Sequence, residues 1–574
     1  MAPLRIWPGL AGAALLLAAR FGLKAAVPGF PGFLLAMQGV MACAVAILVW
    51  WLFFSRAAWL ERMGALGLLV GGLGATWWGK HESMGPAWMF AYAAPFALVG
   101  LVAAVYAGKN LEARRRRFVV ACGIALSTLG WTLIRMEGID GDHNATFAWR
   151  WSVTAEEQLL AKALPMPAAP AVADVPTPRA VPETVVVTPE WPGFRGPNRD
   201  SVVRGLRIAT DWAQSPPREI WRKPVGPGWS SFAVQGGLLY TQEQRGEEEL
   251  VTAYKAESGD LVWRHADGVR FFESNAGAGP RGTPTLANGR VYALGATGVL
   301  NALDAATGRR IWTRKAADDT KRPIPDWGFS ASPVVTQGLV IVYVGRLAAY
   351  DEATGDLKWL GEEVGGSYSS PHLAKMDGME QLLIAAPRGV ASLDPATGKR
   401  LWWHEWPGMP IIQPALLPGG GVLISASQAA GTRRIDTVRG ADGWSVGTKW
   451  TSTALKPYFN DTVIHKGHAY GFDARILACI DLDEGRRVWK GGRYGNGQML
   501  LLADQDLLLV LSEDGDLALV EASPAGYKEL AKMHVLEGKT WNHPVMASGL
   551  LFVRNASEMA AYRLPIADRS TPRQ

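Results

Sequence analysis

The fold is decided by a repeated stretch of sequence, which reads ALDAATGRRIW at residues 302–312. The same pattern stands at 253–263 (AYKAESGDLVW), at 349–359 (AYDEATGDLKW), at 392–402 (SLDPATGKRLW) and, with more changes, at 479–489 (CIDLDEGRRVW). Each copy predicts a strand, a tight turn at Asp-x-x-Thr-Gly in which glycine adopts a positive φ, and a second strand that ends in tryptophan.

Three degenerate copies extend the array, around residues 435–436, 520–521 and 561–562, so that eight copies follow one another at roughly 40 to 50 residues. That period matches one four-stranded blade of a β-propeller. The last copy has no second strand after it, whereas Ile220-Trp221 is a second strand with nothing before it. A closed ring leaves no long sheet edge exposed, so we expect these two ends to pair. The sequence predicts an all-β, eight-bladed propeller over residues 191–565, followed by a tail at 566–574.

The first 135 residues have a different texture, with long uncharged apolar runs. Residues 33–54 and 87–107 are each long enough to span a bilayer as a helix. Shorter or interrupted runs at 6–27, 63–79 and 118–134 bring the expected number of transmembrane helices to about five, with four as the open alternative.

The charges between these runs predict an orientation. Arg56, Arg62 and the basic stretch 109–117 lie in alternate loops, and cytoplasmic loops retain Lys and Arg. We therefore expect the bacterial inner membrane as the location, with the propeller in the periplasm. Residues 136–190 are predicted to form a juxtamembrane segment and a linker, because seven prolines between 165 and 190 favour a semi-rigid spacer.

Composition agrees with a chain that is part membrane and part soluble protein. Hydrophobic residues make up 48% and charged residues 19%, which is too apolar for a disordered protein and too charged for membrane helices throughout. The three cysteines form no pair in sequence, which excludes a disulfide scaffold and a zinc ribbon. The net charge of +6 comes largely from the basic stretch at 109–117, so no nucleic-acid partner is expected.

The A-x-D-x-x-T-G-x-x-x-W repeat resembles that of the pyrroloquinoline quinone (PQQ) propeller superfamily over about residues 191–565. The lead-in WPGFRGPNRD at 191–200 is similar to the segment that precedes many quinoprotein-like propellers. Two branches of the superfamily are relevant, the PQQ-dependent dehydrogenases and the scaffold lipoprotein of the outer-membrane barrel-assembly machinery, which has the repeat without a cofactor. Apolar spans ahead of a propeller are also similar in layout to membrane-bound quinoprotein glucose dehydrogenase.

The resemblance implies that the repeated tryptophans pack between blades and carry no chemistry. Side chains at the start of each innermost strand face the propeller centre, where they would converge on a ligand. This candidate cofactor-binding set comprises Trp229, Arg281, Trp327, Tyr368, Asn460, Asn496, Trp541 and Asn542, with His543 beside them. Flat aromatics could stack on a quinone, and Arg281 could pair with its carboxylates. The alternative, which we favour, is that these side chains plug the centre.

A PQQ dehydrogenase also needs Ca²⁺ held by oxygen ligands and a carboxylate base. The candidate Ca²⁺ ligands are Glu273, Asn275 and Asp461, and the candidate catalytic base is Asp326. Adjacent cysteines, which are typical of the alcohol-oxidising branch, are absent. Blades of this length also leave little sequence for the long loops that would roof an active site and exclude water.

The sequence thus predicts a membrane-anchored periplasmic module that binds a ligand or scaffolds envelope proteins. The alternative is a PQQ-dependent membrane dehydrogenase that oxidises a sugar or an alcohol and passes electrons to ubiquinone. The expected partners are the cytoplasmic membrane and envelope proteins in the first case, and PQQ, Ca²⁺ and ubiquinone in the second. Whether the chain is an enzyme stays open at the level of sequence.

Overall fold

The computed structural model describes residues 4–27, 30–141, 143–162, 190–408, 411–426 and 430–567. The chain forms two compact units, one made of residues 1–153 with 273–277, the other of residues 154–272 with 278–574. The proline-rich linker expected at 165–190 lies outside the described residues, apart from Glu190.

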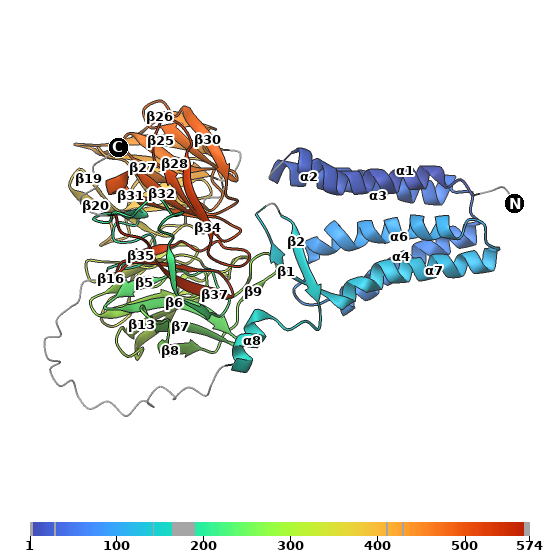
Figure 1. The fold of residues 1–574 in the computed structure, drawn as a ribbon, viewed down its shortest axis with the longest axis horizontal. Helices are drawn as coiled ribbons and strands as arrows, with labels where there is room; N and C mark the ends of the chain where they lie inside the picture. Colours follow the sequence, from blue (N-terminus) through green and yellow to red (C-terminus); the bar gives the residue numbers. More distant parts are fainter. Residues whose placement is uncertain are drawn as a thin grey trace. The chain divides into compact units, whose positions relative to one another are not determined.

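The first unit is built from helices that lie side by side (Figure 1). They are α1 (Trp7–Leu17) continued by η1 (Ala18–Gly22) and α2 (Leu23–Ala26), α3 (Phe30–Val49) continued by η2 (Trp50–Phe54), α4 (Trp59–Gly79), α5 (Pro86–Trp88) continued by η3 (Met89–Ala93) and α6 (Ala94–Ala107), and α7 (Ala113–Leu129) continued by η4 (Gly130–Leu133). A hairpin of β1 (Ile134–Ile139) and β2 (Ala145–Trp149) follows.

Small residues let the helices of this unit approach closely. A Cβ atom added to Gly123 of α7 would lie 2.4 Å from Ala104 of α6. On the other side of α7, the hydroxyl of Thr76 in α4 donates to the carbonyl of Thr128 at 2.8 Å. Close contact between small residues is how helices associate where the hydrophobic effect cannot drive packing.

The expectation of about five spans is corrected, because helix length and apolar composition identify only two candidate spans in the described part of the chain. Among the described residues, only Gly32–Phe54 and Pro86–Ala107 are long and apolar enough to cross a membrane. Arg20 interrupts the first helix, and four arginines lie in the first turns of α7. Glu61 and Arg62 lie in the first turn of α4, and the many glycines of α4 lower its mean hydropathy. Uncharged length alone overstated the number of spans.

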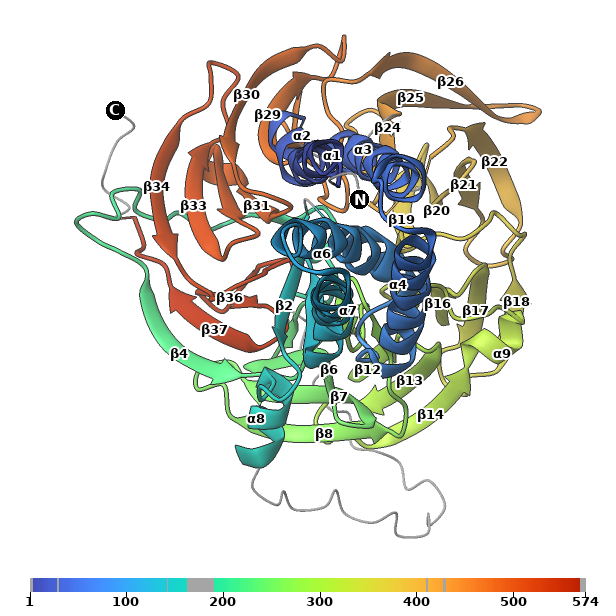
Figure 2. The same ribbon diagram turned by 90° about the vertical axis from the view of Figure 1, so that its right-hand side faces the viewer.

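The second unit is the expected eight-bladed propeller, seen in Figure 2 as sheets around a centre. Blades 1 to 4 consist of β5 (Ala233–Gln235), β6 (Leu238–Arg245), β7 (Glu248–Lys255) and β8 (Leu261–Asp267); β11 (Thr285–Ala287), β12 (Arg290–Leu294), β13 (Val299–Asp304) and β14 (Arg310–Lys315); β15 (Val334–Thr336), β16 (Leu339–Tyr343), β17 (Leu347–Asp351) and β18 (Leu357–Leu360); and β19 (His372–Met376), β20 (Met379–Ala386), β21 (Gly389–Leu393) and β22 (Arg400–Glu405). The short helix α9 (Ala316–Thr320) separates blades 2 and 3.

Blades 5 to 8 follow the same order from the innermost strand outward, with one strand added to blade 7. They consist of β23 (Ala415–Leu416), β24 (Gly421–Ala426), β25 (Gly431–Gly440) and β26 (Gly443–Ser452); β27 (Val463–His465), β28 (His468–Asp473), β29 (Ile476–Asp481) and β30 (Arg487–Arg493); β3 (Val202–Val203), β31 (Gln498–Leu502), β32 (Leu507–Leu511), β33 (Asp516–Glu521) and β34 (Glu529–His534); and β35 (Val545–Ala547), β36 (Leu550–Arg554), β37 (Glu558–Arg563) and β4 (Arg218–Pro224). A short turn, η5 (Ala503–Gln505), joins β31 and β32, and β9 (Phe272–Glu273) pairs with β10 (Gly277–Ala278) outside the blades.

The tryptophan and the glycine of the repeat contact each other across the blade boundary. The indole of Trp312 in blade 2 packs on Gly355, in the turn of blade 3, and a Cβ atom added to that glycine would lie 2.7 Å from the ring. The indole N–H donates to the carbonyl of Glu352 in the same turn at 3.0 Å. Gly355 has a φ of 75°, so glycine is needed both for the turn and for the ring. The structural role expected for the tryptophans is confirmed.

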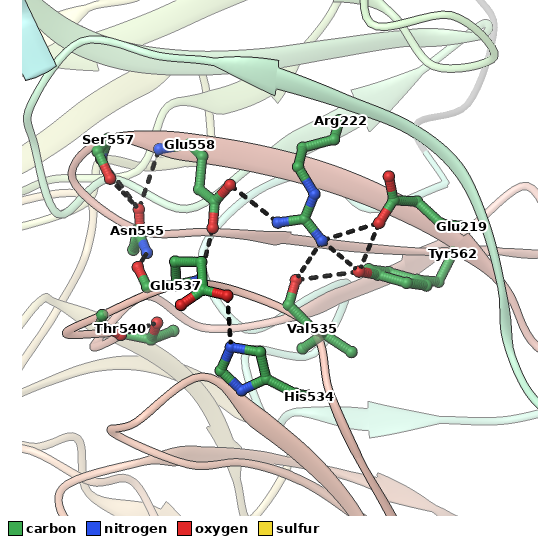
Figure 3. A network of polar contacts seen from close by, with 11 residues as sticks. Glu219, Arg222, His534, Val535, Glu537, Thr540, Asn555, Ser557, Glu558 and Tyr562 are labelled. Atoms are coloured by element: carbon green, nitrogen blue, oxygen red, sulfur yellow. Dashed lines mark hydrogen bonds and ion pairs between the residues drawn. The ribbon is translucent and has the colours of Figure 1, made fainter.

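The ring closes where the repeat pattern predicted. The last strand, β37, pairs with β4, and Ala561 lies opposite Trp221. Arg222 of β4 links that strand to β37, the last strand of the propeller (Figure 3). Its guanidinium donates to Glu558 and Glu219, each at 2.8 Å, and to the hydroxyl of Tyr562 at 2.7 Å. Hydrogen bonding to Arg222, opposed by partial burial, lowers the pKa of Glu219.

Two further segments attach to the propeller. The lead-in 191–203 runs along the innermost strands, since the N–H of Trp191 donates to Val234 of blade 1 and β3 pairs in parallel with β31 of blade 7. Helix α8 (Ala155–Lys162) binds blade 1, because the carboxylate of Glu156 accepts two hydrogen bonds from Arg270, at 2.8 and 2.9 Å. The segment before residues 163–189 and the segment after them therefore both attach to the propeller.

Candidate functional site

A chain of hydrogen bonds runs around the propeller centre at the start of the innermost strands. In five successive blade steps, a backbone N–H donates to a side-chain oxygen of the next blade at 2.8 to 3.1 Å. We call these residues the central ring: Ser231, Thr283, Ser332, Ser370, Gln413 and Asp461. Four of them stand directly before proline in the sequence, which was the signal that could have revealed them.

The lead-in segment places an arginine in this ring. Arg195 is 2% exposed, and its Nε lies 3.6 Å from Oδ2 of Asp461, while a second nitrogen donates to the carbonyl of Thr462 at 3.0 Å. Nε2 of His543 lies 3.2 Å from the same carboxylate oxygen. Burial acts to raise the pKa of Asp461, but Arg195 and then His543 lower it below its usual range. The carboxylate is therefore held ionised, chiefly by the guanidinium of Arg195.

A second arginine and a histidine lie beside this ion pair. Burial, with Arg195 adding to it, lowers the pKa of Arg199 to about 10, and its guanidinium donates to the carbonyl of Pro333 at 3.1 Å. Burial, together with Arg199 and Arg195, lowers the pKa of His372 to about 3. His372 is thus neutral at physiological pH. Neither arginine was singled out from the sequence, because nothing in the lead-in indicates partners more than 130 residues away.

The aromatic residues expected at the centre pair with one another. Trp229 and Trp541 lie 4.8 Å apart between ring centroids, with the ammonium of Lys539 4.3 Å from the Trp541 centroid. Trp327 and Tyr368 form a second pair, also at 4.8 Å.

Arg281 lies next to the second pair. Its Nε donates to the carbonyl of Trp327 at 3.3 Å, and its guanidinium lies 5.2 Å from the centroid of Phe271. The structure thus brings Arg281, Trp327 and Tyr368 together, with the guanidinium bound to backbone carbonyls and to the Phe271 ring.

The three asparagines of the expected set are buried; Asn460 and Asn542 bond to the next blade, whereas Asn496 bonds within its own blade. The amide of Asn460 donates to Gly497 at 2.5 Å and that of Asn542 to Ser230 at 2.7 Å. The backbone N–H of Asn496 donates to Glu513 at 3.0 Å. Within the described part of the chain, Oδ1 of Asn460, Oδ1 of Asn542 and Nδ2 of Asn496 have no hydrogen-bond partner.

The candidate Ca²⁺ ligands belong to different compact units. Asp461 belongs to the central ring, whereas Glu273 and Asn275 lie in the segment that groups with the helical unit, where the Glu273 carboxylate accepts the N–H of Asn275 at 2.7 Å. Asp326 is exposed in a turn. Across the described ranges, no group of three or more His, Cys, Asp or Glu side chains is arranged to hold a metal ion. The assignments of these residues remain predictions.

One titratable residue near Arg281 was missed. Glu249 of β7 is 3% exposed, and burial raises its pKa to about 7, opposed by the backbone N–H of Ala296 at 3.2 Å and by Arg281. The sequence gives no sign that Glu249 is buried, because it follows two other glutamates, Glu247 and Glu248, and such an acidic run is typical of an exposed turn. A buried carboxyl that titrates near neutrality is a mark of functional sites and of structural networks alike.

PQQ would need an aromatic face against its plane and a guanidinium for its carboxylates. Here the faces of Trp229 and Trp327 are directed to Trp541 and Tyr368, and Arg281 bonds to backbone carbonyls. The buried Arg195 is paired with Asp461 of the central ring, so its guanidinium also has a partner within the chain. The arrangement of these residues does not fit PQQ.

Comparison with known proteins agrees with this fold. A protein called outer membrane protein assembly factor BamB from Yersinia pestis is 23% identical over 362 residues, which cover 60% of this chain and 77% of that protein. A quinohemoprotein alcohol dehydrogenase from Comamonas testosteroni is 27% identical over 346 residues, which cover 55% of this chain but only 42% of that enzyme. The chain therefore spans less than half the length of that dehydrogenase.

Solved structures match the chain at low identity and low TM-score. The crystal structure of BamB from Moraxella catarrhalis matches 61% of this chain and 100% of its own, with 14% identity and a TM-score of 0.44. The sequence profile of a PQQ-like repeat family matches residues 212–360, 321–491 and 386–562. Together these matches cover more than half of the chain, which therefore belongs to the propeller family described as outer membrane protein assembly factor BamB.

Proposed function

We propose that this protein is a membrane-anchored propeller that scaffolds protein partners in the bacterial envelope rather than a quinone-dependent enzyme. The observation that carries the proposal is the central ion pair, in which Arg195 of the lead-in lies 3.6 Å from Asp461. A propeller whose centre is packed with its own side chains offers its outer surfaces for binding. The BamB relatives support the same role, since the chain covers 77% of one of them.

The proposed anchor is the helical unit. Its two apolar helices, Gly32–Phe54 and Pro86–Ala107, both end beside basic residues, at Arg56 and at 109–117. Retention of positive charge in the cytoplasm would direct these ends inward. Both ends can lie in the cytoplasm only if α4 (Trp59–Gly79) crosses between the two apolar helices. We therefore propose that the less apolar helices α4 and α7 cross together with them, so that the propeller lies in the periplasm.

A titration of the detergent-solubilised full chain with PQQ and Ca²⁺ tests the proposal. We expect no saturable, Ca²⁺-dependent PQQ binding and no dye-linked oxidation of glucose or simple alcohols. Stoichiometric PQQ uptake with dye reduction, lost in Arg281→Ala and retained in Arg264→Ala, would overturn the scaffold and favour the dehydrogenase. Arg264 is the control because it is exposed on a blade strand of the same propeller.

A further inference from the structure

The helical unit contains a cavity of about 400 Å³ whose walls are mostly aromatic. The rings come from two helices, the turn after α7 and strand β2. The principal lining residues are Arg20, Phe21, Tyr92, Phe96, Trp131 and Phe147. The rings also contact each other, with 5.2 Å between the centroids of Tyr92 and Phe147 and 5.7 Å between those of Trp131 and Phe147. A cavity of this size and lining is typical of a site for an amphiphilic small molecule.

The cavity holds a buried cation with no counter-ion. Arg20 is only 4% exposed, and no side chain or carbonyl in the described residues forms a hydrogen bond or an ion pair with its guanidinium, whose Nε is fully enclosed. Its nearest polar interaction is with the face of Tyr92, whose centroid lies 4.5 Å away. An arginine is always charged, and burying an unpaired charge is strongly unfavourable. The site therefore lacks an anion.

The helices are distorted where they line the cavity. Arg20 and Phe21 lie in the π-helical turn η1 (Ala18–Gly22), and Tyr92 lies in the π-helical turn η3 (Met89–Ala93). Such turns rotate side chains out of the regular helical pattern and are frequent at functional sites. Both distortions direct side chains toward the same cavity.

The surroundings of the cavity indicate the depth at which its ligand lies. Phe147 in its wall precedes Trp149 and Trp151, which stack with 5.1 Å between centroids and are 53% and 66% exposed. Exposed tryptophans gather at the headgroup level of a bilayer. Phe21 at the rim is itself 58% exposed, so the cavity opens onto an apolar surface.

We propose that this cavity binds the anionic headgroup of a lipid, with Arg20 as its counter-ion and the aromatic walls against the upper part of the acyl chains. A phosphate or carboxylate would accept the unused guanidinium donors in a charge-assisted pair. The apolar rim excludes a freely hydrated anion and admits one that carries a hydrocarbon tail. This inference rests on the proposed membrane anchoring, which carbonate extraction of membranes tests separately.

Native mass spectrometry of the full chain in detergent, titrated with dioleoyl phosphatidylglycerol, dioleoyl phosphatidylcholine or inorganic phosphate, tests the inference. We expect phosphatidylglycerol to bind in preference to phosphatidylcholine and inorganic phosphate to compete poorly. Arg20→Met should weaken phosphatidylglycerol binding roughly tenfold or more. Arg5→Met, which removes an exposed arginine of the same unit outside the cavity, should leave it unchanged.

The thermal midpoint of the helical unit gives a second readout. Without lipid, Arg20→Met should raise the midpoint, because it removes an unpaired buried charge, whereas phosphatidylglycerol should raise it only in the wild type and in part in Arg20→Lys. Equal binding of the two phospholipids, full binding by Arg20→Met, or competition by phosphate as tight as by phosphatidylglycerol would each overturn the proposal. A chain released by carbonate that still binds phosphatidylglycerol through Arg20 would refute the anchoring alone.

Discussion

At the residue scale, the turn glycine Gly355 serves two purposes. Gly355 has a positive φ and also contacts the indole of Trp312, whereas Gly338, with a φ of 72°, has no atom within 4 Å of an added Cβ. Gly338→Ala should therefore cost only backbone strain, about 1 kcal/mol. Gly355→Ala should cost roughly 1–3 kcal/mol more, because the added methyl displaces the indole.

Thermal or denaturant unfolding of the two glycine variants in the full chain measures this difference. Equal losses of stability in both would contradict the contact between blade tryptophan and turn glycine.

The buried histidine predicts a pH dependence of stability. The folded-state pKa of His372 is about 3, far below its value of about 6.5 in an unfolded chain. The unfolded state therefore gains a proton as the pH falls below 6.5 while the folded state does not, so stability is lost toward pH 3. Between pH 6 and 4, His372→Gln should remove about 1.4 kcal/mol per pH unit from the slope of the unfolding free energy. Parallel slopes for wild type and variant would show that His372 is solvated.

The sequence predicted contacts between residues that both belong to the repeat. It predicted few of the contacts at the propeller centre. Five of the repeated tryptophans recur with a turn glycine of the next blade, so one period predicts each of these contacts. They are Trp221, Trp263, Trp312, Trp359 and Trp450. Arg195 bonds to Thr462, 267 residues away, and this pairing occurs once. Trp229 and Trp541 likewise belong to blades 1 and 8, at opposite ends of the repeat array. Their positions in the repeat predict that both lie near the centre, but not that they contact each other.

At the element scale, Trp402 shows what the turn of the next blade contributes. Trp402 of blade 4 donates to Gln381 of its own blade at 3.0 Å instead of to the next blade. Blade 5 has no Thr-Gly turn at that place, because β25 and β26 extend as ten-residue strands before they turn. The degenerate copy near residue 436 predicted a weaker match there but not this exchange of partners. Strand β3 was also not foreseen, since two valines in a loop-like segment carry no period.

Closure of the ring at β4 and β37 can be tested by a matched pair of arginines. Arg222 and Arg264 each follow a blade tryptophan, but only Arg222 bonds to Glu558, Tyr562 and the carbonyl of Val535. Arg222→Met should destabilise the propeller by roughly 1–3 kcal/mol, because it leaves buried acceptors unpaired. Arg264→Met, at an exposed site, should stay within about 0.5 kcal/mol of wild type. Similar effects of both substitutions on the unfolding midpoint would argue against closure through β4.

At the scale of the whole molecule, the division into two units was predictable and the number of spans was not. Apolar runs near the N-terminus and a strand repeat after residue 191 have different periods, so the boundary is visible in the sequence. Whether a short apolar run spans a membrane depends on its charges, its glycines and the helices beside it. Among the described residues, only the helices Gly32–Phe54 and Pro86–Ala107 are long and apolar enough to do so by themselves.

The orientation of the chain follows from its basic segment. Alkaline phosphatase fused after Pro189 should be active, because the proposed topology exports everything beyond α7. The same enzyme fused after Lys109 should be inactive, since that residue lies in the basic segment held in the cytoplasm. The reverse pattern of activities would overturn the orientation and the periplasmic location with it.

The central claim is that the lead-in at 191–203 is an integral part of the propeller centre, and hydrogen–deuterium exchange of the full chain tests it most directly. The N–H groups of Trp191 and Ser201 are bonded to Val234 and Arg195, so peptides from this segment should be protected for hours, like those of β31. Peptides containing the exposed hairpin tip at 441–442 should exchange within seconds. Exchange of residues 191–203 as fast as that tip, or loss of their protection on addition of PQQ and Ca²⁺, would contradict a centre filled by the chain itself.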